Sequence, residues 1–238
     1  MIDKIAKLLF PDHCISCKKY GYMICHECKS KLKPHPYMCP VCHKKSDYFQ
    51  VCKNCKIWGI DFDGLDIVFY YDKIIKKLLL QMKYYHKYKV VDFFVDKIVL
   101  SLKSNQLWDD RSRDKKNILV TSVPSHRWRR YMIKWYNQSA LLASWVAQKL
   151  DLEYATIFVK KTHTKTQASL DRKSRLNNLA GAFDLIKGAE DMLHDIDTVL
   201  IVDDVTTTGS TINQLARIIK KLYPHISVRW SVVGRNNR

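Results

Sequence analysis

Two groups of residues in this chain have the types and spacing to do chemistry. The first is a set of eight cysteines in four Cys-X-X-Cys pairs, all within residues 14–55 of a chain of 238 residues. A pair with this spacing presents two thiolates to one tetrahedral ion, and two pairs complete a four-thiolate zinc site. The expected ligands of two zinc ions are Cys14, Cys17, Cys25, Cys28, Cys39, Cys42, Cys52 and Cys55.

The spacing alone leaves open which pairs share an ion. Pairing in sequence order makes two small ribbons, whereas alternate pairing makes a cross-braced module, and we favour sequence order. Because eight thiolates already satisfy two tetrahedral ions, His13, His26 and His43 are expected to be bystanders. An iron–sulfur cluster is disfavoured because the ferredoxin spacings are missing.

The second group is residues 199–211, Val-Leu-Ile-Val-Asp-Asp-Val-Thr-Thr-Thr-Gly-Ser-Thr. The apolar run predicts a buried strand that ends at Asp203 and Asp204. A hydroxyl-rich turn with Gly209 then opens a helix, whose free N–H groups suit a phosphate monoester. The two carboxylates can accept hydrogen bonds from vicinal hydroxyls or hold hydrated Mg²⁺. Together the two halves describe a site for ribose 5-phosphate.

The elements that must position this site alternate between strand and helix after residue 58. Strands are expected at 67–71, 118–120, 155–159, 199–202 and 226–233, and helices at 73–85, 90–103, 138–150 and 210–222. This alternation predicts an α/β fold with a parallel sheet, which binds ligands at the carboxyl ends of its strands. We expect a zinc-binding module at residues 1–58 and a parallel-sheet domain at 59–238, with separate sources of stability.

Composition and charge exclude several classes of protein. Lysine and arginine number 41 against 23 acids, and the formal net charge of +18 favours phosphate-rich partners such as nucleic acid. The dinucleotide and P-loop fingerprints are absent, so ATP hydrolysis at a Walker-type site is not expected. The chain has neither a secretory signal nor an apolar run that could span a membrane. We therefore expect a cytoplasmic protein, and a peripheral position at the inner face of the membrane is compatible with this.

Residues 199–211 resemble the loop by which type I phosphoribosyltransferases bind phosphoribosyl pyrophosphate with Mg²⁺. The resemblance implies that this ligand is held by Asp203, Asp204, Thr206, Thr207, Thr208, Gly209, Ser210, Thr211, Ser125, His126 and Arg127. In an active enzyme, Asp203 and Asp204 would be the catalytic pair.

The order of parts along the whole chain resembles the ComF family, also called GntX-like, of bacterial proteins linked to natural competence. The segments that carry this resemblance are the four cysteine pairs, 123–130, 136–138, 167–183 and 203–211. Where the family usually has Arg-Gly-Phe-Asn-Gln, this chain has Lys134-Trp135-Tyr136-Asn137-Gln138. The resemblance implies a type I phosphoribosyltransferase-like fold. It also implies a role in moving incoming single-stranded DNA into the cytosol with a helicase-like competence ATPase.

Two functions from different classes fit these residues. In the enzyme, a nucleophile attacks C1 of the ribose as pyrophosphate leaves, and a loop at 160–178 closes over the site. No C-terminal hood for an acceptor is evident, so any cover must come from the zinc module or from 60–100. In the binding protein, cations interleaved with aromatic rings hold single-stranded DNA, and the same pattern recurs at 83–89. The first such set is Arg127, Trp128, Arg129, Arg130 and Lys134.

Overall fold

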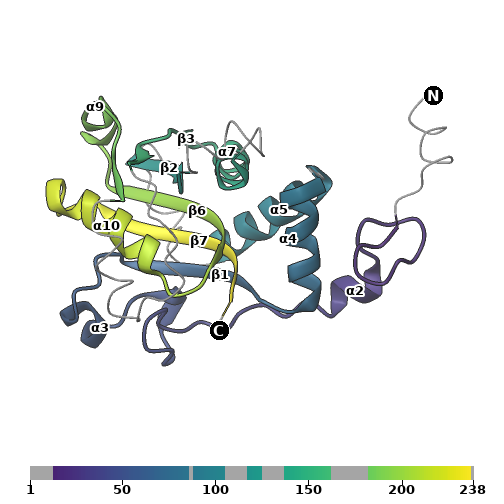
Figure 1. The fold of residues 1–238 in the computed structure, drawn as a ribbon. Coiled ribbons are helices and arrows are strands. Elements are labelled where there is room, and N and C mark those ends of the chain that lie inside the picture. Colours follow the sequence, from purple (N-terminus) through teal and green to yellow (C-terminus); the bar gives the residue numbers. More distant parts are fainter. Residues whose placement is uncertain (1–12, 86–87, 105–116, 125–136, 162–181, 237–238) are drawn as a thin grey trace, which may run out of the picture.

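The computed structural model of this chain describes residues 13–85, 88–104, 117–124, 137–161 and 182–236. Its centre is a five-stranded sheet in the order β1-β7-β6-β2-β3, and every pair of neighbouring strands in it is parallel (Figure 1). The strands are β1 (Gly64–Tyr70), β2 (Ile118–Ser122), β3 (Glu153–Tyr154), β6 (Thr198–Thr206) and β7 (Ser227–Arg235). The predicted parallel α/β fold is confirmed.

Helices cover both faces of this sheet, which is why residues 199–202 of its central strand are all apolar. Val199 and Ile201 of β6 belong to the core under α10 (Ser210–Leu222), whereas Leu200 and Val202 belong to the core on the other face. That other face is covered by α4 (Lys73–Tyr85), α5 (Tyr88–Ser104) and α7 (Gln138–Leu150). When both faces of a strand are buried, its residues do not alternate between polar and apolar, and the sequence shows a continuous apolar run.

The strand predicted at 155–159 is wrong, because the chain changes sheets within it. β3 ends at Tyr154 beside β2, and β4 (Phe158–Lys160) pairs antiparallel with β5 (Phe183–Leu185) in a separate two-stranded sheet. Residues 155–157 connect the two. The short helix α9 (Ala189–Leu193) follows β5 and leads into β6.

The phosphate-site strand is longer than predicted. β6 continues from the expected end at 202 to Thr206, because β7 pairs with it as far as Thr206 opposite Arg235. Asp203 and Asp204 therefore lie within a paired strand and not in the turn after it. The helices predicted at 73–85, 138–150 and 210–222 have the predicted bounds.

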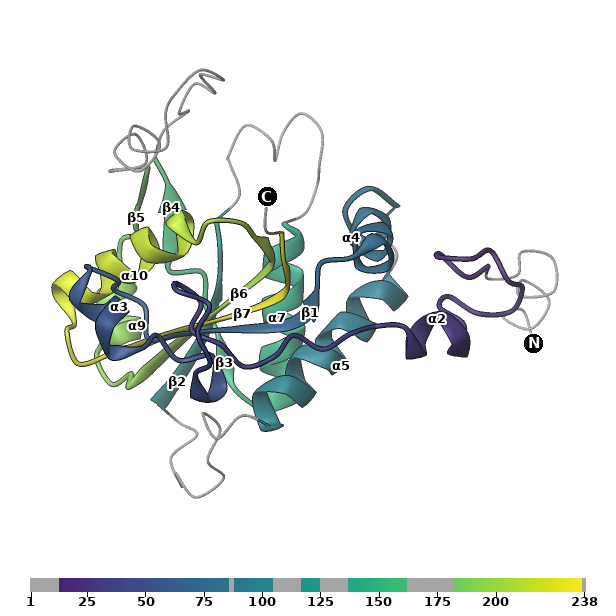
Figure 2. The same cartoon turned by 90° about the horizontal axis from the view of Figure 1, so that it is seen from below.

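The two cysteine groups lie at different places on the domain. The first, with α2 (His26–Ser30), lies beyond α4, where Lys77 Nζ donates to the Ser16 carbonyl at 2.9 Å. The second, with η1 (Asp47–Phe49) and α3 (Lys53–Ile57), lies on the α10 side of the sheet. Figure 2 shows the chain between them running from α2 past α5 to α3.

This connecting chain, residues 29–38, is called the linker below, and together with η1 it covers the edge of the sheet. Pro34 lies opposite Phe69 and Gln50 opposite Gly64 in antiparallel bridges. The His35 N–H also donates to the Val68 carbonyl, at 3.1 Å. The exposed edge of β1 is thereby partly paired with chain from the cysteine region.

The expectation that the cysteine module and the sheet have separate sources of stability is wrong for the second cysteine group. Phe49, Val51 and Cys55 are buried in the same core as Leu65 of β1 and Leu215 of α10. The first group instead forms a small cluster of its own cysteines. In the part of the chain that the structure describes, no helix has the length and apolar character needed to cross a bilayer.

Candidate functional site

The eight cysteines form two groups in sequence order, as favoured from the sequence. We call Cys14, Cys17, Cys25 and Cys28 the first cysteine site, and Cys39, Cys42, Cys52 and Cys55 the second cysteine site. In each, the four Sγ atoms lie within 4.8 Å of one another. Two sulfurs are 3.6 Å apart in the first site and 3.7 Å apart in the second. A tetrahedron with Zn–S bonds of about 2.3 Å needs sulfurs about 3.8 Å apart, so both donor sets fit a zinc ion.

The second cysteine site is tied to the loop that opens α10. Arg235, at the end of β7, donates through Nη1 to the Pro40 carbonyl, beside the ligand Cys39. Its Nε donates to the Thr207 carbonyl at 3.2 Å. Burial lowers the pKa of Arg235 from its ordinary value, and the negative charge of Cys39 works in the opposite direction. One side chain thus joins the second cysteine site to the predicted phosphate loop.

The side of α10 is held by the segment that follows the second cysteine site. Asn213 accepts from the Asp61 N–H at 2.7 Å, and Arg217 Nε donates to an Asp61 carboxylate oxygen at 2.9 Å. One turn further, Lys220 pairs with Asp63, which also pairs with Lys56 of α3. Asn213, Arg217 and Lys220 thus fix the side of α10 against residues 61–63.

The loop at 206–210 has the backbone that a phosphate site requires. Gly209 adopts φ +75°, a left-handed conformation that favours glycine, and α10 begins at the next residue. The N-terminus of α10 has no side-chain cap, so its first N–H groups point outward with the positive end of the helix dipole. Thr207 and Thr208 are exposed beside it, and Thr206 is buried. The arrangement can bind a doubly charged oxyanion.

Of the two carboxylates at the end of β6, Asp204 is buried and Asp203 is partly buried. Asp204 is 8% exposed, and its Oδ2 lies 2.5 Å from Lys83 Nζ of α4. Asp203 Oδ1 accepts from the Ser139 hydroxyl at 2.5 Å and from the Asp204 N–H at 2.8 Å. Each acid is thus held in place by a neighbouring element.

Burial raises the pKa of Asp203 to about 7, with a further contribution from the negative charge of Asp204. Burial also opposes the charge of Lys83, but the attraction of Asp204 outweighs it and the pKa of Lys83 is raised. Asp204 is thus paired with an ammonium group, and next to it lies an acid whose pKa is raised by burial.

The start of α7 joins three elements around these acids. Asn137 caps the helix by accepting from the Ser139 N–H, and its Nδ2 donates to the Val123 carbonyl at 3.0 Å. Gln138 Nε2 donates to the carbonyl of Lys83 at 3.3 Å. The segment predicted to bind pyrophosphate begins at this junction, so α7 positions its first residues against the ends of β2 and α4.

A cavity of about 630 Å³ lies between the phosphate loop and the second cysteine site. Its lining joins Thr207, Thr208, Gly209 and Ser210 to an apolar wall from the cysteine region and the chain after it. That wall includes Pro40, Val41, Ile60 and Phe62. Part of this wall thus comes from residues beside the second cysteine site and from residues 60–65, the regions expected to supply a cover.

Several predicted site residues lie outside the described part of the chain. They are Ser125, His126, Arg127, Trp128, Arg129, Arg130, Lys134 and the loop residues 162–178. Their assignment to pyrophosphate or to DNA stays a prediction. In the structure, Asp203, Asp204 and the residues from Thr206 to Thr211 lie at the carboxyl-terminal end of the central strand β6 and at the start of α10.

Three residues of this site were not predicted for it: Lys83, Ser139 and Arg235. Lys83 was grouped with the cations of a DNA surface, but it pairs with Asp204. The position of Ser139 could have been found from the sequence, because Asn137 is a typical N-cap residue and Ser139 is the second residue of the helix that follows it. Arg235 follows the last predicted strand by two residues, and its bonds span sequence separations that no local pattern reports.

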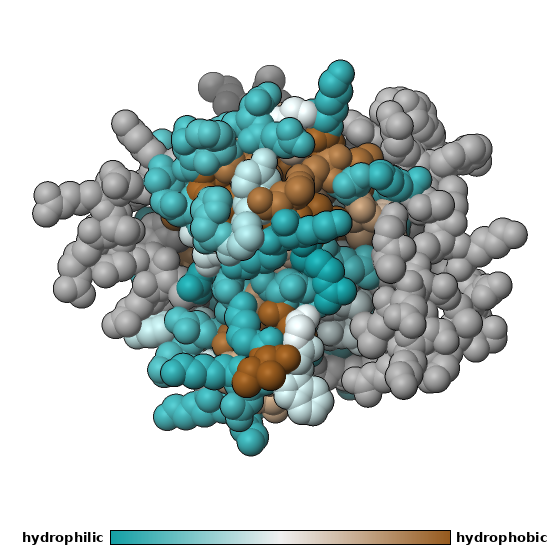
Figure 3. Space-filling view, turned by 90° about the vertical axis from the view of Figure 1, so that its left-hand side faces the viewer, coloured by the Kyte–Doolittle hydropathy of each residue, from teal (hydrophilic) through white to brown (hydrophobic). Residues whose placement is uncertain are grey.

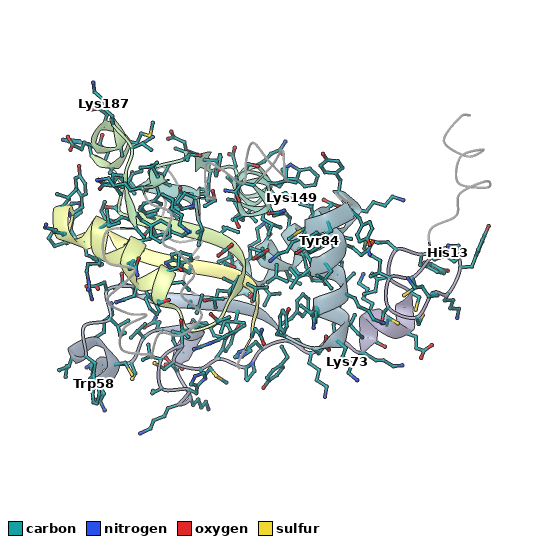
Figure 4. The ribbon with its side chains drawn as sticks, in the orientation of Figure 1. His13, Trp58, Lys73, Tyr84, Lys149 and Lys187 are labelled. Carbon is teal, nitrogen blue, oxygen red and sulfur yellow. The ribbon has the colours of Figure 1, made fainter. Side chains whose placement is uncertain are left out.

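Several large hydrophobic side chains are exposed on the protein surface, and most of them are aromatic. Tyr84, Tyr85 and Tyr88 are each about three-fifths exposed near the end of α4 and the start of α5, and Figure 4 shows Tyr84 there. Ile57 and Trp58 are more than four-fifths exposed at the end of α3, and in Figure 4 Trp58 points away from the ribbon. Figure 3, which faces the end with α3, α9 and α10, shows hydrophobic atoms gathered between hydrophilic side chains.

The fold and this site define a phosphoribosyltransferase-type domain joined to two four-cysteine sites. A family model described as "Phosphoribosyl transferase domain" matches residues 137–238, which include β6, the loop and α10. Over nearly the whole chain, the sequence is a homologue of curated competence and DNA utilization proteins, and the resemblance to the ComF family is confirmed.

Three of these relatives illustrate the extent of the match. Competence protein F of Haemophilus influenzae is 28% identical over 90% of this chain and 93% of its own length. DNA utilization protein YhgH of Escherichia coli K12 is 26% identical over 82% of this chain and 83% of its own length. Competence protein ComFC of Streptococcus pneumoniae is 23% identical over 83% of this chain and 81% of its own length.

Proposed function

We propose that this protein acts in natural competence and DNA utilization, handling incoming single-stranded DNA, and that it binds phosphoribosyl pyrophosphate. The role in competence is supported by the names of relatives that align with most of its length. The ligand is supported by one observation above all. A strand with two adjacent carboxylates runs directly into an uncapped helix N-terminus, within a domain matched by the phosphoribosyl transferase model.

In this proposal the loop from Thr206 to Thr211 holds the 5-phosphate by its hydroxyls and by the N–H groups of α10. Asp203 and Asp204 accept hydrogen bonds from the ribose hydroxyls. Mg²⁺ bound with the ligand neutralises pyrophosphate charge, and the donor set of two carboxylates at this edge fits that ion. Lys83 holds Asp204 until the ligand arrives, and Ser139 fixes the rotamer of Asp203. Residues 125–127 are assigned to the pyrophosphate.

The two cysteine sites are proposed to hold one zinc ion each, so that residues 1–58 form a zinc-binding module and 59–238 the phosphoribosyltransferase-like domain. The sulfur geometry supports zinc in both sites. When bound, zinc supplies a structural cross-link and no chemistry at the phosphate loop.

Single-stranded DNA is proposed to bind the basic, aromatic segment from Arg127 to Lys134, with a helicase-like ATPase as protein partner. The exposed rings of Tyr84, Tyr85 and Tyr88 add stacking surfaces of the kind that single strands use. Affinity should fall steeply with salt, because counterion release from phosphates dominates such binding.

A second candidate function is phosphoribosyl transfer to a small acceptor. The cavity of about 630 Å³ favours it, since that space adjoins the phosphate loop and has an apolar wall. Release of pyrophosphate in the presence of a screen of nucleobases would establish this activity.

The test of the phosphoribosyl site is thermal unfolding with and without phosphoribosyl pyrophosphate and Mg²⁺. A ligand that binds only the folded state raises the unfolding temperature. The variant Thr208→Val should reduce the rise, whereas Thr156→Val, an exposed threonine on the chain between β3 and β4, should leave it unchanged. An unchanged unfolding temperature of the parent protein in saturating ligand would contradict the proposal.

A further inference from the structure

A second cavity, of about 480 Å³, lies between the linker and α5, over the middle of β1. It shares no lining residue with the cavity beside the phosphate loop. Its size is within the range of pockets that bind small ligands. The function proposed above makes no use of it.

One wall of this cavity is a single face of α5. Lys97, Leu100, Ser101 and Ser104 have the spacing that places side chains on the same side of a helix. Leu100 is 60% exposed, which is a high value for a leucine on a helix that packs on a sheet. Ser101 donates to Oδ1 of the buried Asp66 at 2.8 Å, so its hydroxyl is held toward β1. This wall therefore offers an apolar surface with an ammonium group on it.

The opposite wall is aromatic and comes from the linker and η1. The Tyr37 ring meets the Phe49 ring edge-on at 5.0 Å, and the His35 ring lies 5.9 Å from Phe49. Burial lowers the pKa of His35, so its imidazole is neutral near pH 7. Its Nδ1 lies 3.0 Å from the Pro36 carbonyl, which can only accept, and Nε2 is left as an acceptor. A flat ring with N–H groups would find both stacking and a hydrogen-bond acceptor here.

The charge of the lining selects an anion. Lys29 and Lys97 both line the cavity, and its lining contains no aspartate or glutamate. Among the described residues, neither lysine forms an ion pair within 4.0 Å. The combination of aromatic wall, acceptor and two ammonium groups fits a molecule that has a planar ring and a phosphate.

We propose that this cavity binds a nucleotide unit, with its base against Tyr37 and His35 and its phosphate at Lys29 and Lys97. The unit comes either from a free nucleotide or from a single nucleotide of a DNA strand. The proposal depends on the role in DNA handling only for the second of these sources. It is independent of the phosphoribosyl site.

Photo-crosslinking tests this proposal on the full-length protein. One arm uses 4-thiothymidine 5′-monophosphate, and the other uses an oligothymidylate with one 4-thiothymidine, followed by mapping of the labelled peptides. Label is expected on residues 29–37 or 97–104. The variant Lys97→Ala should lower this labelling about fivefold or more, because one charge-assisted phosphate contact is lost. The matched control is Lys103→Ala, an exposed lysine of α5 that does not line the cavity.

The two arms separate the sources, since labelling by the monophosphate supports a free nucleotide and labelling by the oligomer alone supports a strand. Both variants should keep the thermal shift with phosphoribosyl pyrophosphate and Mg²⁺, which shows that they are folded. Label confined to other peptides, or an equal loss in Lys97→Ala and Lys103→Ala, overturns the proposal. Loss of the thermal shift in the parent protein, with labelling intact, would instead count against the phosphoribosyl site.

Discussion

The first and second cysteine sites are alike in their ligands and in their local geometry. In each, the backbone N–H of the third cysteine donates to the sulfur of the first, at 3.4 Å in both cases. Their surroundings differ. The first is clustered with its own cysteines and lies beyond α4, whereas the second shares the core under α10. Two four-cysteine sets with the same geometry therefore have different surroundings. One is a local cluster, and the other is part of the core under α10.

The two cysteine sites also differ in their contacts with the predicted phosphate loop. Arg235 connects the second site directly to the phosphate loop, and the cavity beside that loop has Pro40 and Val41 in its wall. Among the described residues, the first site has neither a bond to the loop nor a place in that cavity. Position in the fold, and not ligand set, decides what each site can influence.

The largest expected effect comes from removing one site at a time. Cys39→Ser with Cys42→Ser should cost one zinc ion and at least about 5 kcal/mol of unfolding free energy, because binding at a structural zinc site contributes about 10 kcal/mol or more. It should also abolish the thermal shift with phosphoribosyl pyrophosphate. Metal analysis and denaturant unfolding followed by circular dichroism measure both results.

The matched variant is Cys14→Ser with Cys17→Ser. It should lose the same amount of zinc. Its loss of unfolding free energy should be only about 2 kcal/mol, because the first site forms a cluster of its own cysteines that can unfold locally while the sheet stays folded. The domain then loses only the burial of an apolar side chain such as Ile15. The thermal shift with ligand should persist. Equal losses of stability and of ligand binding in the two double variants would remove the distinction drawn between the sites.

The pH dependence of stability tests the environment of Asp203 without a substitution in either cysteine site. The raised pKa of Asp203 means that, between about pH 4 and 7, the folded protein binds a proton that the unfolded chain has released. The stability that this group contributes therefore falls as pH rises through this window and is lowest above pH 7. Asp203→Asn keeps the acceptor for Ser139 and cannot ionise. It should raise the unfolding free energy by up to about 4 kcal/mol at pH 8.

The gain should be much smaller at pH 5, where the wild-type carboxyl is already protonated in the folded state. Urea unfolding at the two pH values measures it, and Asp195→Asn, at an exposed acid, serves as the control. A gain that does not depend on pH would show that the effect of Asp203→Asn is steric and not electrostatic.

A smaller effect on ligand binding is expected from replacing Arg235, whose side chain joins the second cysteine site to the phosphate loop. Arg235→Gln should weaken the stabilisation by phosphoribosyl pyrophosphate by about 1–3 kcal/mol, because the side chain holds two carbonyls that flank the loop and the second cysteine site. Arg217→Gln removes bonds to Asp61 and Gly59 but none to the loop. Its effect on ligand stabilisation should be below about 1 kcal/mol, as for an exposed ion pair. Thermal shifts across a ligand titration compare the two.

The smallest effect is expected on the first site's surface. Lys31→Ala breaks the ion pair with Glu27, one turn away on an exposed helix end. Such a pair contributes little to stability, because both side chains are exposed and water and salt screen their attraction. Thermal unfolding of this variant should match the parent protein within error, and a large loss would mean that the first site contributes more to the domain than its contacts indicate.

Local patterns in the sequence predicted the parts of this molecule that depend on local physics. The helix at 210–222 has the bounds predicted from the sequence, and the cysteines group in the sequence order that was favoured, although their spacing had left the alternate pairing open. The extra residues of β6 were not predicted, because they depend on pairing with β7, some thirty residues later in the chain.

The unpredicted part of the site has the same origin. Lys83 has the same local sequence context as the exposed cations near it, and only the packing of α4 beside β6 brings it to Asp204. The burial of both acids likewise depends on α4 and α7 covering the end of β6. Side-chain partners from distant elements are set by tertiary packing, which residue spacing does not encode.

The covered edge of β1 has a consequence for how this protein can be divided. Pro34, His35 and Gln50 occupy hydrogen-bonding positions that an edge strand otherwise leaves open. A fragment starting at the proposed boundary of residue 59 would present seven residues of β1, with free N–H and carbonyl groups along one side. Such an edge is a template for pairing with another copy, so the isolated domain should self-associate through β1. In the whole protein, the cysteine region occupies part of the edge of β1 at which a second copy would pair.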